Sequence, residues 1–373
     1  MNSRERVIAA INHQQPDKIP VDIGSGGQSG ISASTLYKLR KAMGLEERRI
    51  KVIEPFQLLG EVDNDLMKAI GADVIGLWNA ENFMGTRNER WKAWQMPDGT
   101  PTLMPGDFNY DVDADGNTRV YPMGDRSLDH SMVLTRDGSF FNSIDRVPHM
   151  NELDLNAKRD FDGTFGLFDD HTLRQLEKEA KHLSIHTDYA VFGNFGGGGF
   201  GDVAAIPGHF LKNPKGVRRI DDWMMCHLLY PDYIREVYEL QLEAAIRNLE
   251  IYKEAVGDRI QVIAISGTDF GTQNGPFISL ETYRTLYKPY HKAINDWVHQ
   301  NTNWKTFFHS CGSVASLIDD FIDAGVDILN PVQCSAMGMD PQRLKDTYGD
   351  RIVFWGGGVD TQHTLPFGTK ESV

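Results

Sequence analysis

The stretch Lys305-Thr-Phe-Phe-His-Ser-Cys-Gly-Ser-Val314 decides the fold, because it predicts a buried strand that runs into a turn. Within it, His309 and Cys311 are two positions apart. Side chains alternate along an extended chain, so both point to the same side. An imidazole and a thiol aimed together suit a soft tetrahedral metal, with zinc first. Two ligands do not complete a site, so we expect the rest of the chain to supply at least a third.

Working outward from this stretch, strand-like and helix-like segments alternate along the chain. An Asn2-x-x-Glu5 capping box begins the first helix. Apart from the His/Cys stretch, strands are predicted at 19–23, 73–78, 189–192, 260–266, 328–332 and 351–355. Helices are predicted at 2–13, 34–43, 64–70, 172–182, 231–256, 280–300, 314–324 and 341–347.

This alternation predicts a parallel sheet, and its length favours a TIM (β/α)8 barrel, an α/β fold. Such a barrel needs one strand more than the sequence shows, so we expect the last β/α unit to be missing from the chain. We interpret residues 1–373 as a single domain. Residues 85–148 carry hairpin and turn patterns without a helical period, so we expect a β-hairpin insertion there.

Polar and glycine-rich residues follow the predicted strands, where TIM barrels hold their active sites. They are Asn79, the loop from Gly193 to Gly201, Asp269 with Gln273, the pair His309 and Cys311, Gln333 with Cys334, and Asp360. Gly196 to Gly201 formally fits G-x-G-x-x-G, but no clear helix or acidic ribose ligand follows, so a loop over the barrel mouth is favoured. For Asp269, Gln273 and Asp360 the alternative is a turn-capping role, and for His309 and Cys311 it is packing.

The amino-acid composition limits the classes of partner that the protein is expected to bind. The net charge is −14, which argues against nucleic acid or an anionic membrane as the main partner. No apolar run approaches the roughly 18 residues of a membrane span. Three cysteines and the absence of a signal-peptide pattern predict a reducing, cytoplasmic location. Composition does not decide between a monomer and a homodimer.

Several motifs together resemble the uroporphyrinogen decarboxylase superfamily, in its methyltransferase-like branch. The resemblance covers nearly the whole chain except the hairpin insertion. The motifs are Arg4-Glu-Arg-Val-Ile-Ala-Ala-Ile-Asn-His13, Pro16-Asp-Lys-Ile-Pro20, Asp269-Phe-Gly-Thr-Gln273, Tyr287-Lys-Pro-Tyr-His291, His309-Ser-Cys-Gly312 and Phe354-Trp-Gly-Gly-Gly-Val-Asp360. The family's fold is a TIM barrel, which agrees with the alternation of strands and helices.

The resemblance implies a cobamide-dependent methyltransferase. Zinc would be held by His309 and Cys311 with a distant cysteine, which would lie beyond Val373, or with Cys334 from the neighbouring strand. A partner protein would present the corrinoid at the barrel mouth, where Gly196 and Gly198 would let a large flat cofactor approach the backbone. The methyl group would pass to or from a small thiol or another small molecule, in contact with Asn79, Gln273 and Gln333.

Two alternatives remain open. A uroporphyrinogen decarboxylase needs no cofactor, and Asp269 or Asp360 would then stabilise a protonated pyrrole. The missing arginines of the segment from Asp22 to Gly30 argue against a substrate with many carboxylates. The third possibility is a barrel that binds a corrinoid or tetrapyrrole without catalysis.

Overall fold

A parallel sheet of six strands forms the centre of the molecule, in the order β14-β13-β12-β11-β10-β3. The computed structural model describes residues 1–373, except for the side chain of Leu153. The strands are β3 (Val74–Leu77), β10 (Ala190–Gly193), β11 (Val262–Ser266), β12 (Lys305–His309), β13 (Ile328–Asn330) and β14 (Val353–Phe354). All five pairings are parallel. The α/β class is therefore confirmed.

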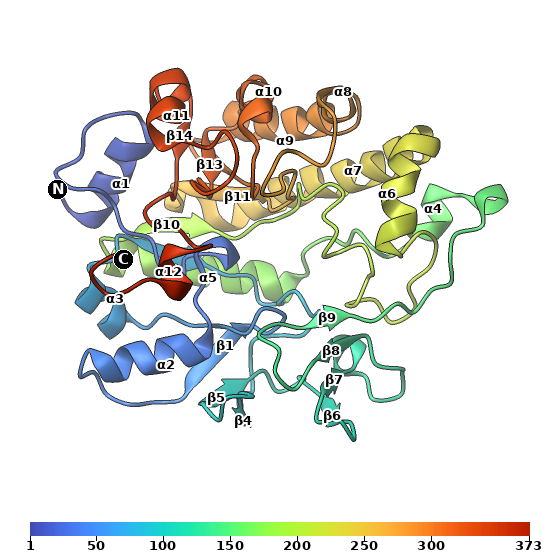
Figure 1. The fold of residues 1–373 in the computed structure, drawn as a ribbon, viewed down its shortest axis with the longest axis horizontal. Coiled ribbons are helices and arrows are strands. Elements are labelled where there is room, and N and C mark those ends of the chain that lie inside the picture. Colours follow the sequence, from blue (N-terminus) through green and yellow to red (C-terminus); the bar gives the residue numbers. More distant parts are fainter.

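Helices separate the strands and cover the sheet (Figure 1). The chain forms α1 (Ser3–Ile11), α2 (Ala33–Ala42), α3 (Asn64–Ile70), α4 (Ala157–Asp160), α5 (Asp170–His186), α6 (Ile220–Leu229), α7 (Pro231–Val256), α8 (Leu280–Thr282), α9 (Lys288–Asn301), α10 (Ile318–Asp323), α11 (Pro341–Tyr348) and α12 (Thr364–Phe367). A π-helical turn (Tyr283–Tyr287) joins α8 to α9, so the predicted helix at 280–300 is present in three parts.

The two faces of the sheet pack into different cores, because alternate side chains point to opposite faces. One face carries an inner core in which Phe192, Val262 and Phe307 pack with Val7 and Ile11 of α1. The opposite face packs against the helices. Its contacts include Val191, Ile263, Phe308 and Leu329 from the strands, with Leu176 of α5, Leu249 of α7, Ile294 of α9 and Phe321 of α10. Helices α5, α7, α9 and α10 thus cover one face of the sheet, and α1 packs on the other.

The sheet does not close, so a TIM barrel is not shown. The predicted strand at 19–23 is wrong: this segment has no strand pairing. Asp73 donates its backbone N–H to the Val21 carbonyl (2.7 Å), but the Val21 N–H bonds to the Asp73 carboxylate (3.0 Å) rather than to a backbone oxygen. Pro20 before it has no N–H to offer. At the other edge, Trp355 Nε1 donates to Asp22 (3.0 Å), so this irregular segment links both edges of the sheet.

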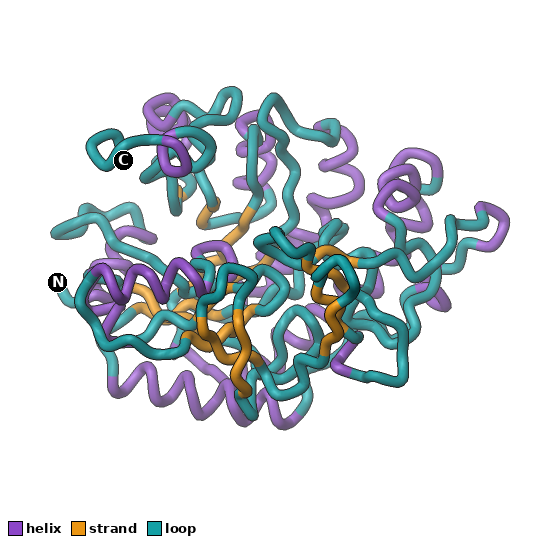
Figure 2. Tube along the Cα trace, turned by 60° about the horizontal axis from the view of Figure 1, so that its bottom comes forward, coloured by secondary structure: helices purple, strands orange, loops and turns teal.

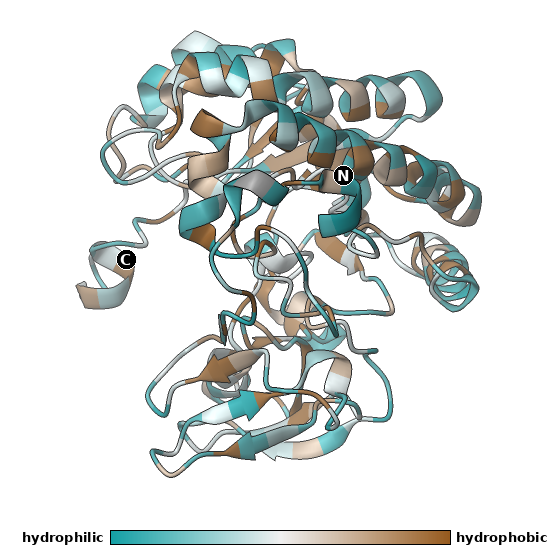
Figure 3. Cartoon of the chain, turned by 90° about the vertical axis from the view of Figure 1, so that its right-hand side faces the viewer, coloured by the Kyte–Doolittle hydropathy of each residue, from teal (hydrophilic) through white to brown (hydrophobic). Residues whose placement is uncertain are grey.

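A smaller lobe is built from two four-stranded sheets (Figure 3). Their orders are β2-β1-β5-β4 and β6-β7-β8-β9. The strands are β1 (Ile50–Glu54), β2 (Leu59–Gly60), β4 (Lys92–Gln95), β5 (Pro101–Met104), β6 (Tyr110–Val112), β7 (Thr118–Val120), β8 (Met132–Leu134) and β9 (Asn142–Ser143). Long loops connect these short strands (Figure 2).

Antiparallel pairings join β4 to β5 and run from β6 through β9 within residues 85–148, and the lobe also takes chain from before this range. Strand β1 pairs with β5 in parallel and with β2 in antiparallel fashion. The core of the lobe includes Leu36 of α2 and Val52 of β1 beside Met104, Phe108 and Phe141. Sequence patterns did not predict β1, β2 or α6 (Ile220–Leu229). No helix among the described residues is long and apolar enough to cross a membrane.

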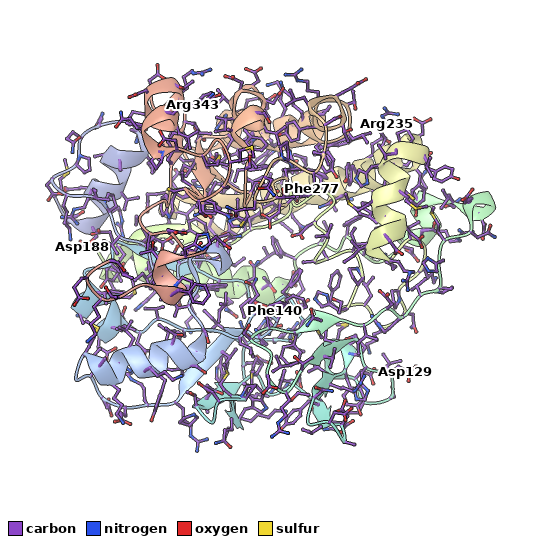
Figure 4. The ribbon with its side chains drawn as sticks, viewed as in Figure 1. Asp129, Phe140, Asp188, Arg235, Phe277 and Arg343 are labelled. Atoms are coloured by element: carbon purple, nitrogen blue, oxygen red, sulfur yellow. The ribbon has the colours of Figure 1, made fainter. Side chains whose placement is uncertain are left out.

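We expect Phe307→Ala to lower the free energy of unfolding by about 3–5 kcal/mol, because it opens a cavity in the inner core. Phe307 is only 2% exposed and its ring meets that of Phe192 edge to face at 4.9 Å. The matched control is Phe140→Ala. Phe140 precedes β9, is labelled in Figure 4 and is 52% exposed. Urea titrations of both variants provide the measurement, with a change within about 0.5 kcal/mol expected for Phe140→Ala. A similarly small change for Phe307→Ala would contradict a packed inner core.

Candidate functional site

His309 is the last residue of β12, and its side chain is fixed by Asn330 at the end of β13. The two residues pair in register, and His309 Nδ1 lies 2.6 Å from Asn330 Oδ1. The amide of Asn330 has one orientation, because its Nδ2 donates to the Trp355 carbonyl (2.7 Å). Oδ1 is therefore an acceptor, and the neutral imidazole must carry its proton on Nδ1. The lone pair of His309 is on Nε2, the nitrogen that a metal would use.

The Nε2 atom faces a thiol and a carboxylate. Cys311 Sγ lies 3.3 Å from His309 Nε2, and Asp269 Oδ1 lies 3.5 Å from the same nitrogen. The ligand atoms of all three residues lie within 4.8 Å of one another. Asp269 comes from the loop after β11, which also carries the labelled Phe277 (Figure 4). We call these three residues the metal cluster.

The spacing of the metal cluster fits a tetrahedral zinc ion. Zinc binds sulfur at about 2.3 Å and nitrogen or carboxylate oxygen at about 2.0–2.2 Å. Tetrahedral angles then place sulfur ~3.6 Å from nitrogen, and nitrogen ~3.4 Å from oxygen. The separations of 3.3 Å and 3.5 Å are close to these values. Three protein ligands would leave one coordination position for a small molecule.

Without a metal, the site keeps its thiol protonated. Burial, and then the nearby Asp269 charge, raise the pKa of Cys311 to about 12. A second carboxyl group stands close by: the pKa of Asp202 is raised to about 6 by burial first and by the Asp269 charge second. A bound cation would reverse both tendencies, because it favours thiolate and carboxylate.

The turn that carries Cys311 is held by its neighbours. The Cys311 N–H donates to Asp269 Oδ1 (2.6 Å), and the Gly312 N–H donates to Gln333 Oε1 (2.9 Å). Gln333 Nε2 in turn donates to Gln273 Oε1 (2.8 Å). Gln273 also donates to the Ser335 carbonyl. Gln273 and Gln333, predicted as binding residues, are thus used in joining the loops around Cys311.

Gly312 and Gly271 allow these loops to meet. Gly312 has φ +81°, and a Cβ there would lie 2.5 Å from the Gly271 carbonyl carbon. A Cβ on Gly271 would lie 2.5 Å from the Cys311 carbonyl oxygen. Any larger residue at either position would push the Asp269 and Cys311 loops apart.

Other predicted residues lie outside the metal cluster. Cys334 Sγ donates to the carbonyls of Val332 (3.4 Å) and Gly357 (3.5 Å), and it does not join the cluster among the described residues. Asp360 is half-exposed and accepts the backbone N–H groups of Gln362, His363 and Thr364, the turn-capping alternative. These hydrogen bonds lower the pKa of Asp360.

Gly196 and Gly198 were both predicted to let a cofactor approach the backbone. Gly196 lines a cavity, whereas Gly198 packs against neighbouring side chains. A Cβ on Gly198 would lie 2.8 Å from Ile265 and 3.0 Å from Ile294, so this residue is needed for loop packing. Gly196 has open space beside it and lines a cavity of about 400 Å³ together with Asn79. The cavity lies between the small lobe and the carboxyl ends of β3 and β10.

Three residues of the site were not predicted from the sequence. They are Asn330, Asp202 and Glu54, the last being a buried carboxyl at the cavity. Asn330 lies inside the predicted strand at 328–332, where no pattern marks it as a site residue. Asp202 follows a glycine and Glu54 precedes a proline, and no sequence pattern marks either residue as functional. Asp269 was predicted as catalytic, and the structure places its carboxylate beside the ligand atoms of His309 and Cys311.

Comparison with known proteins identifies a structural neighbour and no sequence relative. No family model matches the chain, and no curated protein is similar to it in sequence. Among solved structures, a methyltransferase from Methanosarcina mazei aligns with a TM-score of 0.46 and 13% identity, covering 94% of this chain and 81% of that chain.

We expect neutral His309 to be protonated on Nδ1, with Nε2 bare, in long-range proton–nitrogen correlation spectra of the metal-free protein. His309→Gln assigns the signal. Asn330→Leu removes the acceptor and should shift the population toward protonated Nε2, the tautomer that free histidine prefers. A wild-type His309 that carries its proton on Nε2 would contradict the hydrogen bond from Nδ1 to Asn330.

Proposed function

We propose that this chain is a zinc-dependent methyltransferase of the uroporphyrinogen decarboxylase superfamily. It would move a methyl group between a corrinoid carried by a partner protein and a small thiol or other small molecule. The observation that carries the proposal is the metal cluster, in which a bare imidazole nitrogen faces a thiol and a carboxylate. The motif resemblance around His309 to Gly312 supports it.

Each residue of the metal cluster has a distinct role. His309 and Cys311 would supply the soft ligands, and Asp269 the third ligand in place of the distant cysteine or Cys334. Asn330 is a positioning residue, because it holds the His309 tautomer from outside the cluster. Zinc bound there would supply the charge that keeps a substrate thiol deprotonated near neutral pH. Burial, with the charge of Asp269, raises the pKa of Asp202 to about 6, which suits this carboxyl group to a role as proton acceptor or donor in the proposed reaction.

The size of the cavity supports delivery of the corrinoid by a partner. About 400 Å³ is within the range of sites for small molecules, roughly 300–1,000 Å³. A corrinoid is much larger than such ligands, so it would have to approach from outside, over the carboxyl ends of the strands.

The decarboxylase alternative gains no support from the site. Its substrate carries many carboxylates, which call for Arg or Lys donors. The described lining of the cavity includes neither residue type. The cavity is lined instead by Glu54 and Glu81, whose carboxyl groups offer no counter-charge to such a substrate.

We expect about one zinc per chain in the wild type, measured by elemental analysis after purification under reducing conditions. His309→Gln and Cys311→Ser should each lose most of it, and Asp269→Asn should bind it more weakly. Cys334→Ser is the matched control, because it removes a thiol from the same edge of the sheet, and it should keep its zinc. Full occupancy in Cys311→Ser would rule out the metal cluster, and loss in Cys334→Ser would return Cys334 to the ligand set.

We expect the zinc-loaded protein to demethylate free methylcobalamin with a small thiol such as 2-mercaptoethanol, followed by absorbance. Free methylcobalamin stands in for the corrinoid of the partner protein, so the wild-type rate should be low. The reaction should be abolished in Cys311→Ser. Cys334→Ser should retain it. Tight binding of methylcobalamin without any exchange would favour the non-catalytic binding barrel instead.

A further inference from the structure

The cavity beside the metal cluster has features that the proposed function does not use. It is lined by Gln28 of the first loop, Glu54 of β1, residues from Trp78 to Phe83 after β3 and residues from Asn194 to Gly197 after β10. Asp269, His309 and Cys311 are not among its lining residues. It is therefore a cavity separate from the metal cluster, and residues of both lobes line it.

Two residues that line this cavity each carry a buried acceptor without a hydrogen-bond donor. Asn79 Oδ1 and Gln28 Oε1 are buried and unpartnered in the described part of the chain. The orientation of Asn79 is fixed, because its Nδ2 donates to the Asn194 carbonyl (2.8 Å). A buried carbonyl oxygen without a donor is costly, at roughly 1–3 kcal/mol. Such atoms in a cavity wall indicate a ligand that donates hydrogen bonds.

The other amides of the wall are already satisfied as donors. Each remaining asparagine uses its NH₂ group within the protein: Asn82 to Thr86 and Asn88, Asn88 to the Ile53 carbonyl, Asn194 to the Ser25 carbonyl and Asn248 to the Gly166 carbonyl. The NH₂ groups of these four asparagines are therefore already engaged as donors, so a carboxylate or phosphate would find no unengaged NH₂ group among them.

The charged residues that line the cavity also disfavour a carboxylate or phosphate ligand. Glu54 and Glu81 line it, and no Lys or Arg does so among the described residues. The Glu54 oxygens accept the backbone N–H groups of Phe56 (3.1 Å) and Gln57 (2.8 Å), which hold the carboxyl group in place. Arg87 is near Glu81, but its guanidinium pairs with Asp169 at 2.5 Å.

Aromatic rings complete the wall. Trp78, Phe83, Phe168 and Phe195 all line the cavity, and the rings of Phe168 and Phe195 meet edge to face at 6.0 Å. Aromatic faces attract cations and also pack against apolar groups. Free acceptors, carboxyl groups and aromatic rings together are complementary to a small organic cation with N–H groups.

We propose that this cavity binds a small protonated amine, whose N–H groups donate to Asn79 Oδ1 and Gln28 Oε1 and whose charge faces Glu54. The apolar part of the amine packs against the aromatic rings. The site stands whether or not the metal cluster transfers methyl groups, because the two share no residue.

The test is a calorimetric titration of the full chain with three matched probes in an amine-free buffer at pH 8. Benzylammonium has the charge and the N–H groups, benzyl alcohol lacks the charge, and benzyltrimethylammonium lacks the N–H groups. Benzylammonium should bind at least tenfold more tightly than either of the others, as expected for charge-assisted hydrogen bonds. Equal affinities for benzylammonium and benzyl alcohol would overturn the proposal, and so would equal affinities for the two cations.

Two variants assign the binding to this cavity. Glu54→Gln keeps the shape and one acceptor oxygen but removes the charge, and it should weaken benzylammonium about tenfold. Gln28→Leu removes the second free acceptor, which makes no hydrogen bond within the described protein. This variant should weaken benzylammonium binding about fivefold. Glu47→Gln is the control, because Glu47 is an exposed carboxylate of the same lobe. Circular dichroism checks that each variant is folded.

The affinity should also depend on pH. Burial raises the pKa of Glu54 to about 7. The other charged groups here are Glu81, whose pKa burial also raises, and behind it Arg87 and Asp169. The carboxyl group of Glu54 loses its proton between pH 6 and 8 while the amine stays charged, since alkylammonium groups resemble lysine with a pKa of about 10.4. Binding should therefore strengthen over this range in the wild type and change much less in Glu54→Gln.

A Cys311→Ser variant separates this site from the proposed function. It should lose zinc and yet bind benzylammonium with wild-type affinity. Unchanged benzylammonium binding in both Glu54→Gln and Gln28→Leu would overturn the assignment of the site, whatever the zinc content.

Discussion

The side-chain amide of Asn330 is the interaction on which the site depends. Its NH₂ group donates to the carbonyl of Trp355, beyond β14, and its oxygen accepts from His309 at the end of β12. One amide thus couples three neighbouring strands and fixes one tautomer of one imidazole. The bare Nε2 of His309 follows from this arrangement, and so does the possibility of a metal there. Parallel strands in register are what bring these three chain segments to the same edge.

The loops beyond that edge then decide what the imidazole faces. Ser310 Oγ accepts the Phe270 N–H (2.9 Å) and the Ser313 N–H donates to the Thr272 carbonyl (2.8 Å), so two hydrogen bonds join the Asp269 loop to the Cys311 turn. The cavity is built from a different set of loops and from the small lobe. The two groups of residues, the metal cluster and the cavity lining, share no member.

The sequence predicted the elements with strong local patterns. The capping box of Asn2 and Glu5 is present, and the helix at 231–256 has the predicted bounds. Periodicity could not show that the carboxylate of Asp73 takes the N–H of Val21, which turns a predicted strand into an irregular segment. Nor could it show that β1 pairs with β5. Site residues held by side-chain contacts between adjacent strands of the sheet, such as Asn330, carry no local sequence pattern.

The zinc K-edge X-ray absorption spectrum of the purified protein tests most directly whether zinc binds at the metal cluster. We expect one sulfur at about 2.3 Å, with the remaining ligands nitrogen or oxygen at about 2.0–2.2 Å. That shell corresponds to Cys311 with His309 and Asp269. A shell with two sulfurs would show that a second cysteine completes the site, and a shell without sulfur would show that the metal does not bind at Cys311.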